Sequence, residues 1–93
     1  MIRSFGSKET AAVWEGKKPR TLPPDVVVNA LRKLNLLSSV TQLKTLADIP
    51  GNRLEQIRSV PGLRSIRINQ KYRIVFWWKD GWAENVEIVD YKH

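Results

Sequence analysis

The stretch Ser-Ile-Arg-Ile-Asn-Gln-Lys-Tyr-Arg-Ile-Val-Phe, residues 65–76, alternates apolar and polar side chains on both sides of a polar break. Such alternation is typical of strands with one buried face, and two alternating runs around a short polar segment predict a β-hairpin. A three-residue loop at 69–71 pairs Ile68 with Tyr72 and Ile66 with Ile74, which keeps the apolar side chains on one face. This hairpin decides the predicted fold, because the rest of the chain has to cover its apolar face.

The same register places Arg67 directly opposite Arg73 on the other face of the hairpin. Like charges that face each other across a strand pair destabilise the pair. The two arginines are therefore better explained by a polyanion that binds this face, and the obvious polyanion is a nucleic acid.

Helical patterns precede the hairpin. Ser7 is a plausible N-cap for a first helix over residues 10–14, which Gly16 ends. Pro23-Pro24-Asp25 opens a second helix that runs to about Ser38, because proline suits the first turn and aspartate complements the helix dipole.

The remaining segments predict strands and one further turn of helix. Their ranges are a short strand at 2–5, a short helical turn or irregular packed segment at 43–49, and strands at 53–57, 64–69, 72–78 and 84–90. The last four ranges are rich in β-branched and aromatic residues and are separated by turn residues. The sequence therefore predicts an α+β protein, one domain over residues 1–93, with two N-terminal helices packed on one face of an antiparallel sheet.

The last hairpin contains two conflicting signals. Asp80-Gly81 is a strong two-residue turn signal, but that turn places Ile74 opposite Glu87. A loop of three or five residues instead groups Ile74 with Ile88, Phe76 and Val86 on one face. We expect the longer loop, with the helices on this apolar face and the arginine face open to solvent.

Composition limits the chemistry of the protein. The chain has 93 residues, no cysteine and a single histidine, His93. Disulfides, thiolate metal sites and a cysteine nucleophile are therefore impossible, and neither a histidine-rich metal cluster nor an ordinary Ser-His-Asp triad is available. Neither a metal nor another cofactor is expected.

Charge indicates the class of partner. The formal net charge is +7, which favours nucleic acid, an anionic membrane face or an acidic protein as the partner, although such a charge can also serve solubility. No apolar run is long enough to span a bilayer, and residues 1–7 lack the apolar core of a signal peptide. We expect a soluble cytoplasmic protein without a membrane partner.

Arg67, Arg73, Asp90, Tyr91 and His93 converge on one region in this scheme, because Tyr91 continues the arginine face at the end of the last strand. Such a set could cleave RNA. Attack of a ribose 2′-hydroxyl on the adjacent phosphate needs a base, an acid and cations that stabilise the phosphorane. Guanidinium groups suit the last role, because their paired donors match phosphate oxygens.

Each of these residues also has a plain structural interpretation. Tyr91 could be a half-buried packing residue, Asp90 an ion-pair partner of Arg73, and His93 a frayed end. Three tryptophans, Trp77, Trp78 and Trp82, either stack on bases or pack the hairpin or a protein partner.

Several motifs resemble the HigB toxins, a branch of the RelE-like superfamily. These are Pro-Gly-Asn-Arg-Leu-Glu at 50–55, Ser-Ile-Arg-Ile-Asn at 65–69, Tyr-Arg-Ile-Val-Phe-Trp-Trp at 72–78 and Val-Glu-Ile-Val-Asp-Tyr at 86–91. The resemblance implies a RelE-like compact antiparallel sheet and a bacterial type II toxin. That toxin is a metal-independent endoribonuclease that cuts mRNA in the ribosomal A site and is restrained by a HigA-like helix-turn-helix antitoxin.

The resemblance also implies roles for individual residues. Arg67 and Arg73 match the positions that neutralise the phosphate, and Asp90 and Tyr91 match the first two residues of a terminal Asp-Tyr-His motif. Here Lys92 follows the tyrosine and His93 comes after it, so either His93 reaches the site, Lys92 supplies a cation, or activity is reduced.

Further basic residues are expected to contact the partners. Those expected to contact RNA or the ribosome are Arg53, Arg64, Lys71 and Lys92, and those expected to contact the antitoxin are Lys17, Lys18 and Arg20. DNA is expected to bind only through the antitoxin complex. Two other functions remain open: a non-catalytic module that blocks translation by binding RNA or the ribosome, and a domain that binds an acidic protein.

Overall fold

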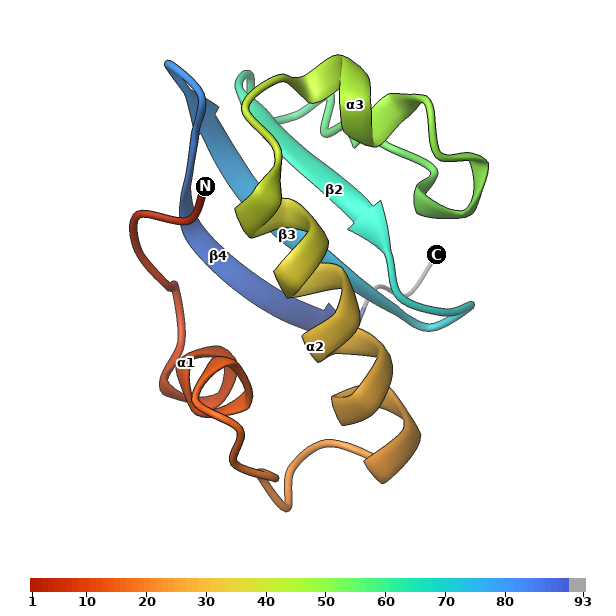
Figure 1. Ribbon diagram of the computed structural model, residues 1–93. Helices are drawn as coiled ribbons and strands as arrows, with labels where there is room; N and C mark the ends of the chain where they lie inside the picture. The colour runs from red at the N-terminus through yellow and green to blue at the C-terminus, as the bar shows by residue number, and fades with distance from the viewer. Residues whose placement is uncertain (91–93) are drawn as a thin grey trace.

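The computed structural model describes residues 1–90 of the chain. Within this range the protein has an α+β fold, with helices and a four-stranded antiparallel sheet of order β1-β2-β3-β4 (Figure 1). The elements are α1 (Lys8–Trp14), α2 (Pro24–Ser39), α3 (Leu43–Ala47), the 3₁₀ turn η1 (Pro50–Asn52), β1 (Glu55–Gln56), β2 (Leu63–Arg67), β3 (Tyr72–Lys79) and β4 (Trp82–Asp90). The predicted fold class is confirmed.

The two predicted N-terminal helices are present, and their ends have the expected causes. The hydroxyl oxygen of Ser7 accepts a hydrogen bond from the backbone N–H of Thr10 at 3.1 Å and caps α1. Gly16 follows the helix at a φ of +89°, a conformation that suits a residue without a side chain. The second helix begins at Pro24 and carries Asp25 in its first turn.

The register of the central hairpin is as predicted. Ile66 pairs with Ile74 and Arg67 pairs with Arg73. The loop is closed by Asn69, whose side-chain oxygen accepts hydrogen bonds at 2.8 Å from the backbone N–H groups of Lys71 and of the next residue. An asparagine that bonds to the backbone in this way stabilises a tight turn.

The predicted loop of the last hairpin is wrong. Lys79 pairs with Trp82, so Asp80-Gly81 forms a two-residue turn, with φ values of +50° and +84° that match a type I′ turn. The apolar face is nevertheless preserved. Between the pairs Trp77–Glu84 and Val75–Glu87, β4 uses one residue more than β3, with Asn85 at a φ of +51°.

This β-bulge resolves the conflict between the two sequence signals. It shifts the register by one residue, so that Ile74 pairs with Ile88 and both side chains are buried. The turn dipeptide and the apolar pattern are both satisfied, because the extra residue lies inside the strand and not in the loop.

The edges of the sheet differ from prediction. The segment expected as a strand at 2–5 forms two isolated parallel bridges to β4, Ile2–Ala83 and Phe5–Val86, and so covers its outer edge. The buried hydroxyl of Thr10 accepts a hydrogen bond from the N–H of Ile88 at 2.9 Å and extends this cover. At the opposite edge, β1 contains only Glu55 and Gln56, both exposed.

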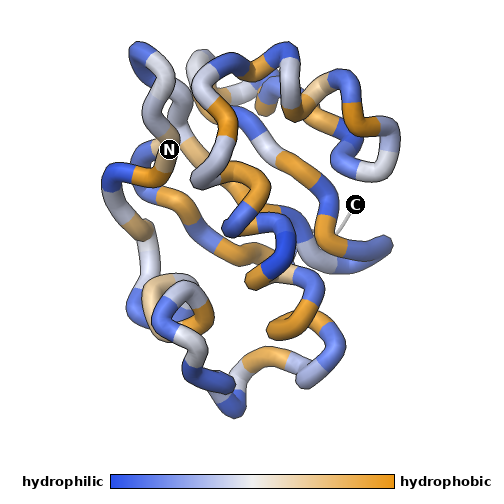
Figure 2. Tube along the Cα trace, in the orientation of Figure 1, coloured by the Kyte–Doolittle hydropathy of each residue, from blue (hydrophilic) through white to orange (hydrophobic). Residues whose placement is uncertain are grey.

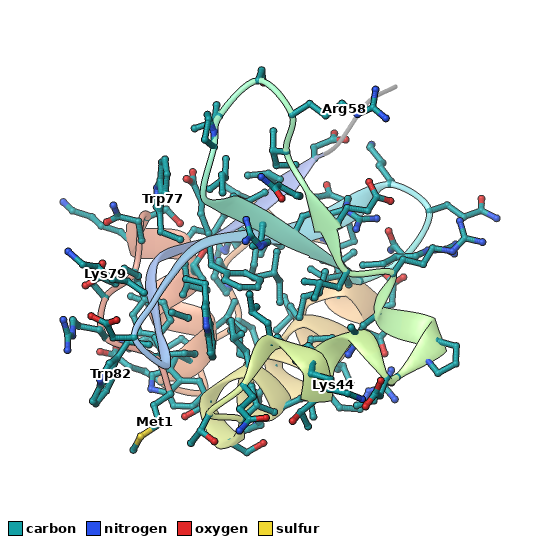
Figure 3. All side chains as sticks on the ribbon, turned by 90° about the horizontal axis from the view of Figure 1, so that it is seen from above. Met1, Lys44, Arg58, Trp77, Lys79 and Trp82 are labelled. Atoms are coloured by element: carbon teal, nitrogen blue, oxygen red, sulfur yellow. The ribbon has the colours of Figure 1, made fainter. Side chains whose placement is uncertain are left out.

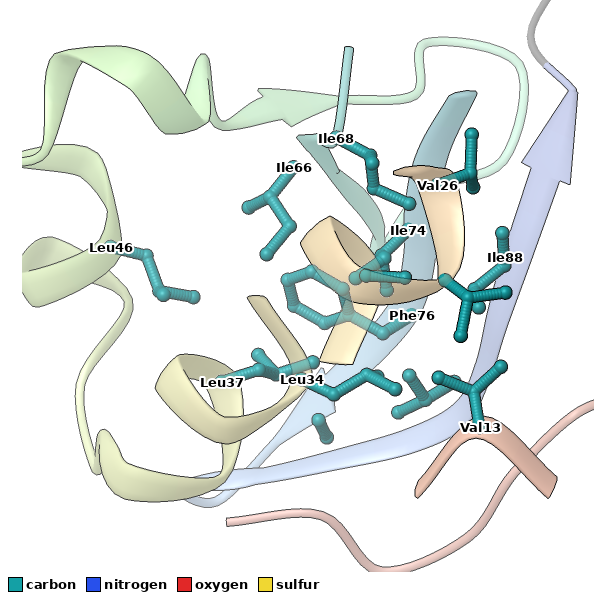
Figure 4. Packing of buried hydrophobic residues seen from close by; sticks show 14 of the residues in the cluster. Val13, Val26, Leu34, Leu37, Leu46, Ile66, Ile68, Ile74, Phe76 and Ile88 are labelled. Carbon is teal, nitrogen blue, oxygen red and sulfur yellow. The ribbon is translucent and has the colours of Figure 1, made fainter. Parts of the chain in front are cut away.

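One hydrophobic core joins the helices to a single face of the sheet (Figures 2 and 4). Its members are Val13, Leu22, Val26, Val27, Ala30, Leu34, Leu37, Val40, Leu46, Ile66, Ile68, Ile74, Phe76, Ala83, Val86 and Ile88. The aliphatic residues and the phenylalanine predicted for the apolar face of the sheet are all buried: Ile66, Ile68, Ile74, Phe76, Val86 and Ile88. None of the helices within residues 1–90 combines the length and the apolar character that crossing a membrane requires.

A buried polar link joins α2 to η1. Asn52 is fully buried, its side-chain nitrogen donates to the carbonyl of Leu46 at 3.1 Å, and its side-chain oxygen accepts from the ammonium of Lys33. Burial, with a smaller contribution from the charge of Arg32, lowers the pKa of Lys33. Both polar ends of Asn52 are therefore paired inside the fold.

Replacing Asn52 by alanine is expected to lower the free energy of unfolding by about 2 kcal/mol, because two polar partners lose their bonds in a buried place. Urea unfolding followed by circular dichroism measures the change. Asn35→Ala is the matched control, since the Asn35 side chain is exposed and, within residues 1–90, bonds only to the carbonyl of Leu31 in its own helix. Equal effects of the two substitutions would show that the buried link contributes nothing.

Candidate functional site

The face of the sheet that lies away from the core carries the candidate site. Strand alternation and the pairings place Ser65 and Arg67 of β2, and Arg73 and Trp77 of β3, on this face. Glu87 and Val89 of β4 continue it, because they pair with Val75 and Arg73. We refer to this surface as the arginine face.

Arg73 is not exposed on the arginine face, so the expectation of a fully open face is wrong at this residue. Only 7% of Arg73 is accessible to solvent. Its Nε donates to the hydroxyl of Ser65 at 2.9 Å, and its Nη2 donates to the carbonyl of Arg53 at 2.7 Å. The carboxylate of Glu55 lies 3.8 Å from the same Nη2.

The backbone just before β1 produces this arrangement. Arg53 follows η1 in the left-handed conformation, at a φ of +43°, and its carbonyl oxygen bonds to Arg73. Left-handed backbone is uncommon for a residue with a side chain and needs support from its surroundings. The bond to a buried guanidinium is one such support.

These contacts revise the electrostatic argument from the sequence. Part of the charge of Arg73 is balanced inside the protein, by the carboxylate of Glu55 and by oxygens of Ser65 and Arg53. The opposed arginines therefore do not by themselves require an external anion. What they provide is a guanidinium held in a defined position by charge-assisted hydrogen bonds.

Arg67 has a different environment. It is half-buried, and within residues 1–90 no hydrogen bond or ion pair involves its side chain. Its backbone is held opposite Arg73 by the strand pairing. Among the described residues, none uses the N–H donors of the Arg67 guanidinium. Of the two arginines, Arg67 is therefore the one that can donate hydrogen bonds to an incoming anion.

Asp90 does not join the arginines. Strand alternation from the buried Ile88 places it on the helix-covered side of β4, and it pairs with Tyr72. Its carboxylate lies 3.5 Å from the ammonium of Lys71, so among the described residues its ionic partner is Lys71 and not Arg73. The predicted roles of Tyr91, Lys92 and His93 fall on residues outside the described range.

The predicted RNA contacts are separated by the fold. Arg53 is exposed beside the site, and Lys71 is exposed in the hairpin loop. Arg64 instead pairs with Phe76 on the helix side of the sheet, where its Nη1 is buried without a hydrogen-bond partner. The structure thus brings Arg53 close to Arg73 and places Arg64 on the other face.

The predicted antitoxin contacts lie elsewhere. Lys17, Lys18 and Arg20 form the connector between α1 and α2, at the end of α2 that is remote from α3 (Figure 1). All three are exposed, and Lys17 forms an ion pair with Glu15 at 3.3 Å.

Each of the three tryptophans of the last hairpin has a ring contact within the described residues. Trp78 packs against the core and meets Phe76 edge to face, with ring centres 6.4 Å apart. Trp77 lies against Gly62, where an added side-chain carbon would come within 3.3 Å of its ring. The guanidinium of Arg3 lies 4.8 Å from the ring centre of Trp82, a cation–π distance.

Sequence reasoning missed the residues that hold Arg73. The contact of Ser65 with Arg73 could have been predicted from the sequence. Ser65 is a small polar residue on the arginine face, diagonally across from Arg73 in the predicted register. The contact of Glu55 with Arg73 could not have been predicted, since the position of Glu55 depends on the pairing of a two-residue strand with β2.

The chain is similar to known proteins over nearly its whole length. Residues 3–92 match the family model of the HigB-like toxins, described as the RelE-like toxin of type II toxin-antitoxin system HigB. Toxin HigB-1 of Vibrio cholerae serotype O1 is 36% identical over 95 residues, and the alignment covers 100% of each protein. Both similarities include the hairpin that carries Arg67 and Arg73.

Proposed function

The chain belongs to the HigB-like toxins, the RelE-like toxins of type II toxin-antitoxin systems, and from this membership we propose that it is a ribosome-dependent endoribonuclease that cleaves mRNA. The observation that supports this activity best is the pair of opposed arginines, one held rigidly and one without a partner among the described residues. A substrate phosphate fits such a pair, because cleavage of RNA develops negative charge on the phosphate.

In the proposed reaction Arg67 binds the oxygens of the scissile phosphate through its paired donors. Arg73 stays in the network made by Ser65 and Arg53 and supplies a fixed positive charge directly opposite. A charge that is already oriented needs no rearrangement as the phosphorane forms, which is the main advantage of preorganised sites. The guanidinium charge makes this mechanism independent of a metal ion.

Proton transfer is assigned to the end of the chain. The ribose 2′-hydroxyl loses a proton to a base as its oxygen attacks phosphorus, and the departing 5′-oxygen gains a proton from an acid. We assign these tasks to Tyr91 and His93, with Lys92 as an added cation. Asp90, which pairs with Lys71, acts by orienting this segment.

A type II toxin has an antitoxin partner. We propose that this partner is a HigA-like helix-turn-helix protein, that it contacts Lys17, Lys18 and Arg20, and that only the antitoxin brings the complex to DNA. The proposed place of action is the bacterial cytoplasm, where mRNA is translated.

Mapping of mRNA 5′ ends tests the proposed function. Purified protein is incubated with a defined mRNA, with and without translating ribosomes, and primer extension locates any new ends. We expect new ends only when ribosomes are present. Translation arrest without new ends would indicate the non-catalytic ribosome-binding module instead, and the absence of both would contradict each of these functions.

A further inference from the structure

Charge is distributed unevenly across the sheet. Residues 53–73, which run from just before β1 through β2 to the first two residues of β3, contain six basic residues and one acidic residue, Glu55. Residues 82–90, which form β4, contain Glu84, Glu87 and Asp90 and no basic residue. The sheet therefore has a basic side at β1 and β2 and an acidic side at β4.

The basic side includes a residue that sequence reasoning did not assign. Arg58 lies in the loop between β1 and β2, is exposed, and has no hydrogen bond or ion pair within the described part of the chain. Figure 3 shows this loop rising from the sheet on the side away from the helices, with Arg58 on it and with Lys79 and Trp82 far from it. Arg58 thus projects beyond the arginine face.

The backbone of the β1–β2 loop, which carries Arg58, is fixed by hydrogen bonds and by packing. The backbone N–H of Ile57 donates to the carbonyl of Leu63 at 2.9 Å, and the N–H of Leu63 donates to the carbonyl of Val60 at 3.1 Å. Gly62, at a φ of +90°, packs directly on the ring of Trp77. An anchored loop reduces the entropy that a contact through Arg58 would cost.

The acidic side of the sheet repels a phosphate backbone. Glu84 lies on the arginine face of β4, opposite Trp77, and its only ionic partner within residues 1–90 is Arg3, at 3.3 Å. Glu87 is on the same face, and no ion pair neutralises it among the described residues. A polyanion bound at Arg67 therefore has a more favourable electrostatic energy when it extends toward the β1–β2 loop than when it crosses β4.

We propose that the RNA strand held at Arg67 continues over the β1–β2 loop, where Arg58 binds a second phosphate. This inference rests on the proposed function, since it extends the same RNA beyond the scissile phosphate. Arg58 is here a binding residue, remote from the reacting atoms.

Charge reversal at Arg58 tests the proposal. The matched control is Arg32→Glu, which makes the same change at an exposed arginine of α2, on the helix side of the molecule. The probe is a bacterial ribosome programmed with a short synthetic mRNA, and its Kd for each variant is measured over a series of salt concentrations. Thermal unfolding verifies that both variants are folded.

Arg58→Glu is expected to raise the Kd about tenfold and to reduce the salt dependence of binding by about one phosphate contact, while Arg32→Glu leaves both unchanged. Equal values for the two folded variants would overturn the proposal. If the wild-type protein binds and cleaves while Arg58→Glu matches it, only the Arg58 contact is refuted. If the wild-type protein neither binds nor cleaves, the proposed function itself fails.

Discussion

Arg67→Ala is expected to slow mRNA cleavage on the ribosome by about 10²–10³-fold, the usual effect of removing one donor that stabilises a developing oxyanion. The fold is expected to remain intact, because no hydrogen bond or ion pair within residues 1–90 involves this side chain. The substitution also removes the repulsion between two arginines that face each other across the strands. Single-turnover cleavage of mRNA on programmed ribosomes measures the rate, and thermal unfolding measures the stability.

The control for this substitution is Arg32→Ala, which removes an exposed arginine from the helix side of the molecule. It is expected to cleave at the wild-type rate. Cells that express Arg67→Ala without the antitoxin are expected to grow, whereas cells that express Arg32→Ala are not. A folded Arg67→Ala protein that cleaves at the wild-type rate would refute the role of Arg67.

Arg73→Ala is expected to reduce both cleavage and stability. The substitution leaves the carbonyl of Arg53 and the buried hydroxyl of Ser65 without their donor, which is expected to lower the free energy of unfolding by about 2 kcal/mol. Growth of cells is therefore an insufficient readout for this residue, because an unfolded toxin also permits growth. Urea unfolding and single-turnover cleavage have to be measured on the same preparation.

Arg73→Lys separates charge from geometry. Lysine keeps the positive charge, but its ammonium cannot reproduce the planar donor set that bonds Ser65 and Arg53 together. We expect a stability between those of the wild-type and Arg73→Ala proteins, and cleavage at least about tenfold slower than wild type, since a displaced charge loses its preorganisation. Wild-type stability and cleavage in Arg73→Ala would show that the network around Arg73 has no role.

The central hairpin shows which structural features the local sequence pattern predicts correctly. The alternation around 65–76 was sufficient to predict the pairing of Ile66 with Ile74 and of Arg67 with Arg73. A shift of one residue would have moved every apolar side chain to the solvent face, so the apolar pattern permits one register. The same reasoning identified the caps of α1 and the start of α2, where single residue types act locally.

The final hairpin shows a structural feature that the local sequence pattern does not predict. The apolar face and the Asp80-Gly81 turn are both visible in the sequence, but in a hairpin with regular strands they require different registers. The extra residue at Asn85 satisfies both, and the segment 1–6 that bonds to β4 stabilises it: the N–H of Asn85 donates to the hydroxyl of Ser4 at 2.9 Å. A bulge supported by a segment so distant in the chain has no signature in a short window of sequence.

The sequence by itself determined the fold class, the buried face of each long strand and the opposition of Arg67 to Arg73, because these follow from side-chain periodicity over a few residues. Only the tertiary structure decided that Arg73 is buried and held in place while Arg67 has no partner among residues 1–90. The physical reason is that Arg73 donates a hydrogen bond to the carbonyl of Arg53, twenty residues away, and forms an ion pair with Glu55. Such contacts depend on how the chain before β1 folds back over the sheet, which periodicity within a strand does not encode.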